Sequence, residues 1–175
     1  LFPDQPLISC HCILQGCRIR MLRSYTIIDG QHITAKAPAT VLNRKIPLVR
    51  GFDDMFLAPH SRHTEVPIED IRACKEITIL AESEEAGLFL AMAQGGRRIF
   101  VMGHPEYDRI TLDGEYKRDL SKGLPIDMPK NYYPDDDPNN KPVLTWRAAA
   151  NNLYTNWLNY YVYQATPYDL EGTPF

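Results

Sequence analysis

Three apolar runs in close succession constrain the fold of this chain most strongly. They are rich in aliphatic, β-branched and aromatic residues, and charged residues and glycines separate them. The runs are EITILA (76–81), LFLAMAQ (88–94) and RRIFVMG (97–103). The first two predict a β-hairpin, and the third predicts a further strand that ends directly before His104. The sequence therefore places an ionisable side chain at the end of a buried strand.

The residues around these strands predict two helices, a loop and one more strand. Residues 109–122 and 145–164 repeat apolar side chains at helical spacing, and Thr145 is a candidate N-cap. The apolar positions are Ile110, Leu112, Tyr116 and Leu120 in the first helix, and Trp146, Ala150, Leu153, Trp157 and Tyr161 in the second. Prolines recur through residues 125–142, which predicts a long surface loop. The run LISC predicts a short strand, whereas the residues from there to position 40 show no sustained period.

Composition narrows the class of protein. The length of 175 residues suits one domain with its own core, and the net charge of -3 without a basic run does not favour nucleic-acid binding. No apolar stretch reaches membrane-spanning length, so no membrane partner is expected. The four cysteines, Cys10, Cys12, Cys17 and Cys74, do not form the pattern of a disulfide framework, which favours a reducing cytosol.

The stretch GHPEYD contains a candidate catalytic pair. His104 and Glu106 are two residues apart, so both side chains point to the same side if the strand geometry continues past Gly103. A carboxylate beside an imidazole fixes its tautomer and stabilises its protonated form, as a general base requires. A histidine at a strand end beside a solvated glutamate is the alternative interpretation.

A second polar stretch, FLAPHSRHTE (56–65), permits several interpretations. His60 and His63 have a spacing found in some zinc sites, so with His104 and Glu106 they suggest a metal-dependent hydrolase as an alternative function. Ser61 is a candidate nucleophile, but the G-x-S-x-G elbow is missing. A polar loop that contacts substrate and an ordinary polar turn after a proline are equally compatible with this stretch.

Two further residue types suit a transfer reaction. Cys10 and Cys12 follow an apolar run, and a cysteine at a strand-to-helix turn is favoured as a thiolate nucleophile. A buried structural cysteine is the alternative. Arg118 on the first predicted helix suits a carboxylate ligand because its guanidinium binds one through two hydrogen bonds, although the neighbouring charges mostly predict a solvated face.

Five long motifs between residues 41 and 170 follow one another in an order typical of one enzyme family. The motifs are LVRGFDDMFLAPHSRHTEV, ILAESEEAGLFLA, VMGHPEYDRITLDGEYKRDL, NYYPDDDP and TWRAAANNLYTNWLNYYVYQATPYDL. They resemble the homoserine O-acyltransferases of methionine biosynthesis, called homoserine O-succinyltransferase or homoserine O-acetyltransferase. The resemblance implies an α/β fold of the class I glutamine amidotransferase type, a three-layer sheet with flanking helices, and a cytoplasmic enzyme that often forms homodimers.

The resemblance also implies the reaction and the residues that perform it. An acetyl or succinyl group passes from acyl-CoA through a cysteine thioester to the hydroxyl of L-homoserine, without a metal or another cofactor. His104 matches the general base, and Glu106 matches its orienting carboxylate. Ser61 and Arg118 match substrate-binding positions, with Arg118 on the homoserine carboxylate. Lys36 is the nearest counterpart of a lysine that the family places before the GFDD motif.

Residues 1–40 depart from the family pattern and form a divergent segment. The nucleophilic cysteine is expected at a spacing before Ser61 that Cys10 and Cys12 bracket, but the tryptophan and the alanine-rich helix that should follow it are missing. We therefore expect a single-domain C-terminal fragment from a truncated or frame-disturbed gene, lacking the N-terminal half of the fold and having little transferase activity alone. A non-catalytic fragment or interaction module is the other alternative.

Overall fold

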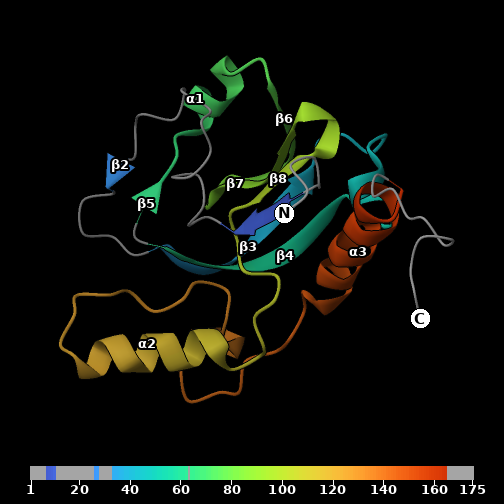
Figure 1. The fold of residues 1–175 in the computed structure, drawn as a ribbon. Coiled ribbons are helices and arrows are strands. Elements are labelled where there is room, and N and C mark those ends of the chain that lie inside the picture. Colours follow the sequence, from blue (N-terminus) through green and yellow to red (C-terminus); the bar gives the residue numbers. More distant parts are fainter. Residues whose placement is uncertain (1–6, 11–25, 28–32, 63, 165–175) are drawn as a thin grey trace, which may run out of the picture.

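A six-stranded, mainly antiparallel sheet forms the centre of the protein (Figure 1). The structure is a computed structural model that describes residues 7–10, 26–27, 33–62 and 64–164. The strand order is β1-β8-β7-β6-β3-β4, in which only the β1–β8 pair is parallel. The strands of this sheet are β1 (Leu7–Cys10), β3 (Ile33–Val41), β4 (Met55–Arg62), β6 (Ile77–Ser83), β7 (Gly87–Ala93) and β8 (Arg98–Val101). Strands β2 (Thr26–Ile27) and β5 (Thr64–Glu65) pair separately.

The strands that the sequence predicted are present, but two long strands were missed. The β6–β7 hairpin, β8 and β1 confirm the four predicted strands. The FLAPHSR stretch was predicted as a polar loop or turn, but it belongs to strand β4. Every residue of β4 is paired with a residue of β3. Each of these strands contains a proline, Pro38 or Pro59, and β4 (MFLAPHSR) contains no β-branched residue. Long-range pairing therefore formed these strands where local propensity opposed them.

The strand directions place the carboxyl ends of β1, β8 and β4, together with that of β6, at the same end of the sheet. Because β1 is parallel to β8 and the intervening pairs up to β4 are antiparallel, β1, β8 and β4 all run in one direction. The sheet also curls, so that the backbone N–H of His104, beyond β8, donates to the carbonyl of Pro59 in β4 at 2.8 Å. The ends of β1, β4 and β8 therefore form one edge at which side chains from distant parts of the sequence meet.

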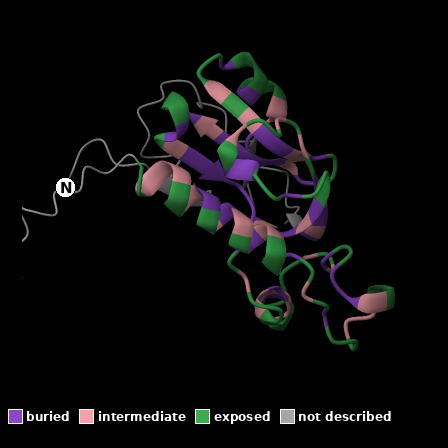
Figure 2. Ribbon diagram, turned by 90° about the vertical axis from the view of Figure 1, so that its right-hand side faces the viewer, coloured by how far each residue is buried: buried purple, intermediate pink, exposed green. Residues whose placement is uncertain are grey.

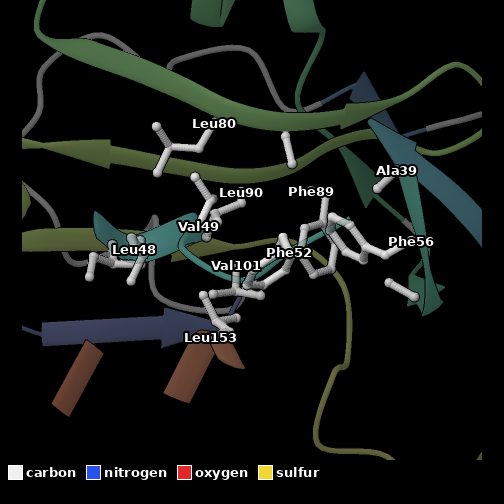
Figure 3. Close-up of a cluster of buried hydrophobic side chains, with 13 residues drawn as sticks. Ala39, Leu48, Val49, Phe52, Phe56, Leu80, Phe89, Leu90, Val101 and Leu153 are labelled. Atoms are coloured by element: carbon white, nitrogen blue, oxygen red, sulfur yellow. The ribbon is translucent and has the colours of Figure 1, made fainter. Parts of the chain in front are cut away.

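Helices cover both faces of the sheet, which confirms the predicted three-layer α/β architecture. Helix α3 (Arg147–Trp157) packs on one face, where Leu153 joins the core shown in Figure 3. Helix α1 (Ile68–Ala73) packs on the other face, where Ile71 joins a second cluster. Strand β8 serves both clusters, because Ile99 contributes to the first and Phe100 to the second. Figure 2 shows that the buried residues are concentrated in the strands.

Helix α2 (Thr111–Ser121) lies apart from the sheet, below it in Figure 1, and has a small core of its own. The predicted helix over 109–122 is confirmed, but its apolar stripe is not: Leu112 is buried, whereas Ile110 and Leu120 are exposed. The predicted surface loop instead buries Tyr132 and Tyr133, which pack against Leu112. The loop therefore supplies the core that a helix with so few apolar residues cannot supply itself.

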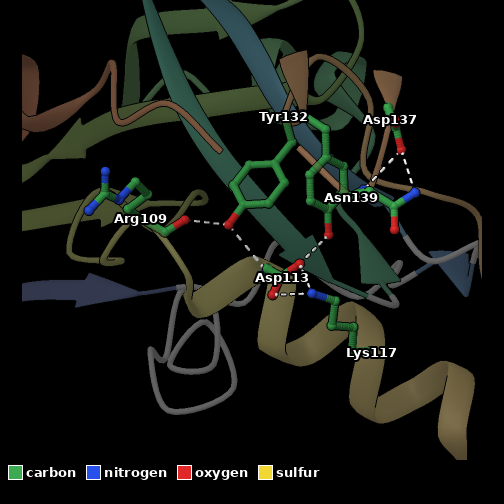
Figure 4. Close-up of polar contacts among 7 residues, drawn as sticks. Arg109, Asp113, Lys117, Tyr132, Asp137 and Asn139 are labelled. Atoms are coloured by element: carbon green, nitrogen blue, oxygen red, sulfur yellow. Dashed lines mark hydrogen bonds and ion pairs between the residues drawn. The ribbon is translucent and has the colours of Figure 1, made fainter. Parts of the chain in front are cut away.

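Hydrogen bonds fix this loop to α2 (Figure 4). The hydroxyl of Tyr133 donates to Asp113 Oδ1 at 2.7 Å, and the hydroxyl of Tyr132 donates to the carbonyl of Arg109. Lys117 also donates to the Asp113 carboxylate, at 2.9 Å. Burial, with a smaller contribution from Asp113, raises the pKa of Tyr133, so its hydroxyl stays protonated and continues to donate.

The last predicted helix is confirmed as α3 with a π-helical extension, Leu158–Val162, but its start differs from the prediction. Trp146 is the N-cap residue, and no side chain caps the helix, so Thr145 does not have the predicted role. Trp146 was also predicted to lie on the apolar stripe of this helix, but it does not pack on the sheet with Leu153. It packs instead with Tyr132 and Leu112 in the core of α2, and so links α2 to α3.

Asn156 is a buried amide that fixes α3 to the segment before β4. Its Nδ2 donates to the carbonyls of Leu48, at 3.0 Å, and Arg50, at 2.7 Å. We expect Asn156→Ala to lower the free energy of unfolding by about 1–3 kcal/mol, because it leaves a buried carbonyl without its donor. Chemical denaturation would measure the change. Asn151→Ala, at an exposed position of the same helix, should stay within about 0.5 kcal/mol of the parent, and an equal loss in both variants would contradict the prediction.

Candidate functional site

The predicted pair of His104 and Glu106 is in contact. The Nδ1 of His104 lies 2.8 Å from Glu106 Oε1, within hydrogen-bond distance. The His104 side chain is 13% exposed and that of Glu106 is 43% exposed, so the imidazole is largely covered while the carboxylate remains accessible to water. Because Nδ1 faces the carboxylate, Nε2 is the ring nitrogen that could exchange a proton with a substrate.

A turn, and not a continued strand, produces this contact. Strand β8 ends at Val101, and the backbone N–H of Tyr107 donates to the carbonyl of His104 at 3.1 Å. Extended geometry past Gly103, the condition under which the sequence placed both side chains on one side, is therefore not met, and the turn brings the two side chains into contact instead. Gly103 is required for close packing, since a Cβ there would lie 2.9 Å from the ring of Phe89 and 3.0 Å from the carbonyl oxygen of Pro59.

Tyr107 lies directly against the imidazole, which the sequence did not predict. Its ring stacks on His104 with centroids 4.2 Å apart and 16° between the planes. Its hydroxyl donates to Glu115 Oε1 of α2 at 2.7 Å, and its carbonyl accepts from Trp146 Nε1 at 2.9 Å. Burial, followed by the hydrogen bond to Glu115, raises the pKa of Tyr107. The positive charge of Arg118 opposes this rise in the pKa of Tyr107.

His60 and Ser61 lie at the end of β4, at the edge of the sheet that carries His104. His60 is fully buried, and its ring lies edge-on to Phe89 with centroids 6.0 Å apart. Burial, with smaller effects from the charges of Arg62 and His104, lowers the pKa of His60 to about 3, so it is neutral near pH 7. Ser61 is partly buried on the opposite side of the strand.

The proposed group of metal ligands is not supported by this geometry. The Nδ1 of His60 faces the guanidinium of Arg62, at 3.4 Å from Nη1, and a cation in that position opposes metal binding. His63 lies outside the described residues. Within the described part of the chain, no group of three or more His, Cys, Asp or Glu side chains is arranged to hold a metal ion.

The remaining predicted residues lie at different distances from this edge. Cys10 ends β1 and is in register with Val101 of β8, so its backbone is at the same edge as His104. Cys12 lies outside the described residues. Lys36 of β3 lines a separate groove with Leu57, Tyr133 and other residues, and none of the other predicted site residues lines that groove. Burial lowers the pKa of Lys36.

Arg118 lies on the exposed side of α2 and binds the carboxylate of Asp119, the next residue in the sequence. Its Nε and Nη2 donate to the two oxygens of Asp119 at 2.7 and 2.8 Å, so its guanidinium already binds one carboxylate in the bidentate manner expected for a ligand. Glu115 precedes Arg118 by three residues and so shares its side of the helix. Two residues that the sequence did not propose for the site, Tyr107 and Glu115, thus contact each other, and Tyr107 contacts the predicted His104.

Together, the fold and the pair define an α/β protein with a contacting histidine–glutamate pair at the carboxyl ends of its strands. A family model described as homoserine O-succinyltransferase matches residues 33–168. The chain therefore belongs to the homoserine O-succinyltransferase family.

Curated relatives carry the name homoserine O-acetyltransferase. The one from Lachnoclostridium phytofermentans is 70% identical over 130 residues, which are 74% of this chain and 43% of the relative. The one from Lachnospira eligens is 65% identical over 130 residues, 74% of this chain and 42% of the relative. The chain thus spans less than half the length of the curated relatives it matches.

Among solved structures, a glutamine amidotransferase from Thermotoga maritima is similar with a TM-score of 0.42 and 16% identity, over 75% of this chain and 48% of that chain. Within the described residues, no helix combines the length and the hydropathy needed to span a membrane.

Proposed function

We propose that this chain carries the general base and the substrate anchor of a homoserine O-acyltransferase. The observation that carries the proposal is the contact between His104 and Glu106 inside the segment that matches the family. The names of the relatives favour acetyl-CoA as the acyl donor over succinyl-CoA. The product, an O-acylhomoserine, would serve methionine biosynthesis in the cytoplasm.

In this proposal His104 performs the proton transfers. Its Nε2 takes the proton of the homoserine hydroxyl while the hydroxyl oxygen attacks the carbonyl carbon of a cysteine thioester. The new C–O ester bond forms, the C–S bond breaks, and the thiolate leaves. Glu106 at Nδ1 holds the tautomer whose Nε2 accepts the proton, and it stabilises the imidazolium that results. Cys10, at the same sheet edge, and Cys12 both remain candidate nucleophiles.

Arg118 is the proposed anchor of the homoserine carboxylate, and Ser61 is a proposed further contact. The guanidinium would exchange its bond with Asp119 for one with the substrate, or hold both carboxylates through its several N–H donors. Ser61 is supported by its place at the end of β4, beside the turn that carries His104. Lys36 has less support, because it lines a different groove.

The test requires a background that supplies the part of the relatives that this chain does not span. Residues 33–168 would replace the matching segment of the Lachnoclostridium phytofermentans relative, and release of CoA thiol from acetyl-CoA would be followed at varied homoserine concentrations. We expect homoserine-dependent turnover by this chimera. Metal removal by a chelator should leave the rate unchanged, and a chelator-sensitive hydrolysis without homoserine would instead favour the metal-dependent alternative.

Arg118→Ala tests the anchor in the same chimera. Its homoserine KM should rise roughly 10- to 100-fold, which corresponds to the loss of a charged hydrogen bond of about 1.5–3 kcal/mol. Lys117→Ala is the matched control, since Lys117 is exposed on the same helix and pairs with Asp113. An unchanged homoserine KM in Arg118→Ala would remove Arg118 from the site.

A further inference from the structure

Tyr107 has more contacts across this site than the proposed chemistry requires. Its ring, hydroxyl and carbonyl each contact a different neighbour: His104, Glu115 of α2, and Trp146 at the start of α3. The three contacts come from the turn, from α2 and from the segment that links α2 to α3. A residue with a packing role only would not need a directional contact to each of these elements.

The ring of Tyr107 restrains the imidazole in a way that Glu106 alone cannot. The second side-chain torsion of histidine is broad, so the hydrogen bond at Nδ1 does not by itself fix the tilt of the ring plane. Glu106 is also 43% exposed, and water competes for its oxygens. A ring stacked at 4.2 Å and nearly parallel removes this tilt and fixes the direction of Nε2.

The hydroxyl of Tyr107 restrains α2 relative to the same turn. Helix α2 does not pack on the sheet, and the short bond from Tyr107 to Glu115 ties its middle to the turn that carries His104. Glu115 is three residues before Arg118, so a shift of α2 would displace the guanidinium. The hydroxyl stays protonated because its pKa is raised, and it therefore remains a donor throughout the neutral range.

We propose that Tyr107 is a positioning residue with two separable effects: its ring orients His104, and its hydroxyl holds the helix that carries Arg118. This inference rests on the proposed function. Removing the ring should reduce kcat, because the base is misdirected, whereas removing only the hydroxyl should raise the homoserine KM, because the anchor moves.

Two substitutions in the chimera separate the effects. Tyr107→Phe keeps the ring, so its kcat should stay within about twofold while its homoserine KM rises roughly tenfold. Tyr107→Leu should lower kcat roughly 10- to 100-fold, as expected for a misplaced catalytic group. Tyr163→Phe, at an exposed tyrosine, is the control for the loss of a hydroxyl and should change neither constant. Equal effects of Tyr107→Phe and Tyr107→Leu on kcat and KM would overturn the proposal.

Nuclear magnetic resonance of the 175-residue chain provides a readout that does not need activity. The imidazole C–H signals of His104, assigned with His104→Gln, should lie upfield because of the stacked ring, remain there in Tyr107→Phe, and move downfield in Tyr107→Leu. Unmoved signals in Tyr107→Leu would overturn the stacking role. If the unsubstituted chimera has no turnover while these signals move as expected, the proposed function fails and the restraint of His104 by Tyr107 stands.

Discussion

His104→Gln is expected to lower kcat for acyl transfer to homoserine by about 10²- to 10⁴-fold in the chimera, the usual contribution of a general base. The amide cannot take the hydroxyl proton, whereas the backbone hydrogen bond from residue 104 to Pro59 is retained. The loss should therefore appear in kcat with the homoserine KM nearly unchanged, because Arg118 is not affected. Initial rates of CoA thiol release would give both constants.

Glu106→Gln provides the graded comparison for this prediction. The side-chain amide oxygen can still accept a hydrogen bond from Nδ1, so the tautomer is retained, but the negative charge that stabilises the imidazolium is lost. The kcat of Glu106→Gln should fall below the parental value, but by a smaller factor than the kcat of His104→Gln. A His104→Gln variant that keeps more than about a tenth of the parental kcat would rule out His104 as the base.

Local sequence patterns predicted the strands whose own residues carry a clear signal, including the short β1, although β1 pairs with the distant β8. The β6–β7 hairpin and β8 follow one another in the chain, so their apolar runs and turn residues are sufficient signals. Strand β3 pairs with β4 across a connection that contains a separate turn of 3₁₀ helix, Pro47–Val49, and both strands contain prolines. Their stability comes from tertiary pairing, which a local window of sequence does not contain.

The difference between local sequence signals and long-range contacts also explains which site residues could be predicted. The spacing of His104 and Glu106 within one short motif indicated their contact, even though a turn and not a strand produces it. Tyr107 was visible in that motif, but its stacking depends on the turn, and its bond to Glu115 depends on where α2 lies. His60 was interpreted as a metal ligand because of its spacing from His63, or as part of a polar loop or turn after Pro59. Its burial follows from the unpredicted pairing of β4.

Phe89 is a buried core residue that also packs against the residues around His104, so a substitution there should affect both the core and the site. It is 1% exposed, and its ring lies edge-on to Phe56, with centroids 5.0 Å apart, and to His60. The ring of Phe89 also packs closely against Gly103, the residue before His104. Figure 3 shows Phe89 grouped with Phe56 and Phe52 in the main core. One side chain therefore contacts the core, the end of β4 and the turn that carries His104.

Phe89→Ala is expected to lower the free energy of unfolding by about 3–5 kcal/mol, because it removes buried surface and leaves a cavity that strands on both sides cannot close. This is a large part of the roughly 5–15 kcal/mol that stabilises a typical domain. Denaturant unfolding should show a lower midpoint with an unchanged slope. Phe89→Leu, which fills most of the space, should cost clearly less, and Met55→Ala, at a side chain that is 59% exposed, should change stability by no more than about 0.5 kcal/mol. If Phe89→Ala costs no more than Met55→Ala, the ring of Phe89 does not support the turn that carries His104.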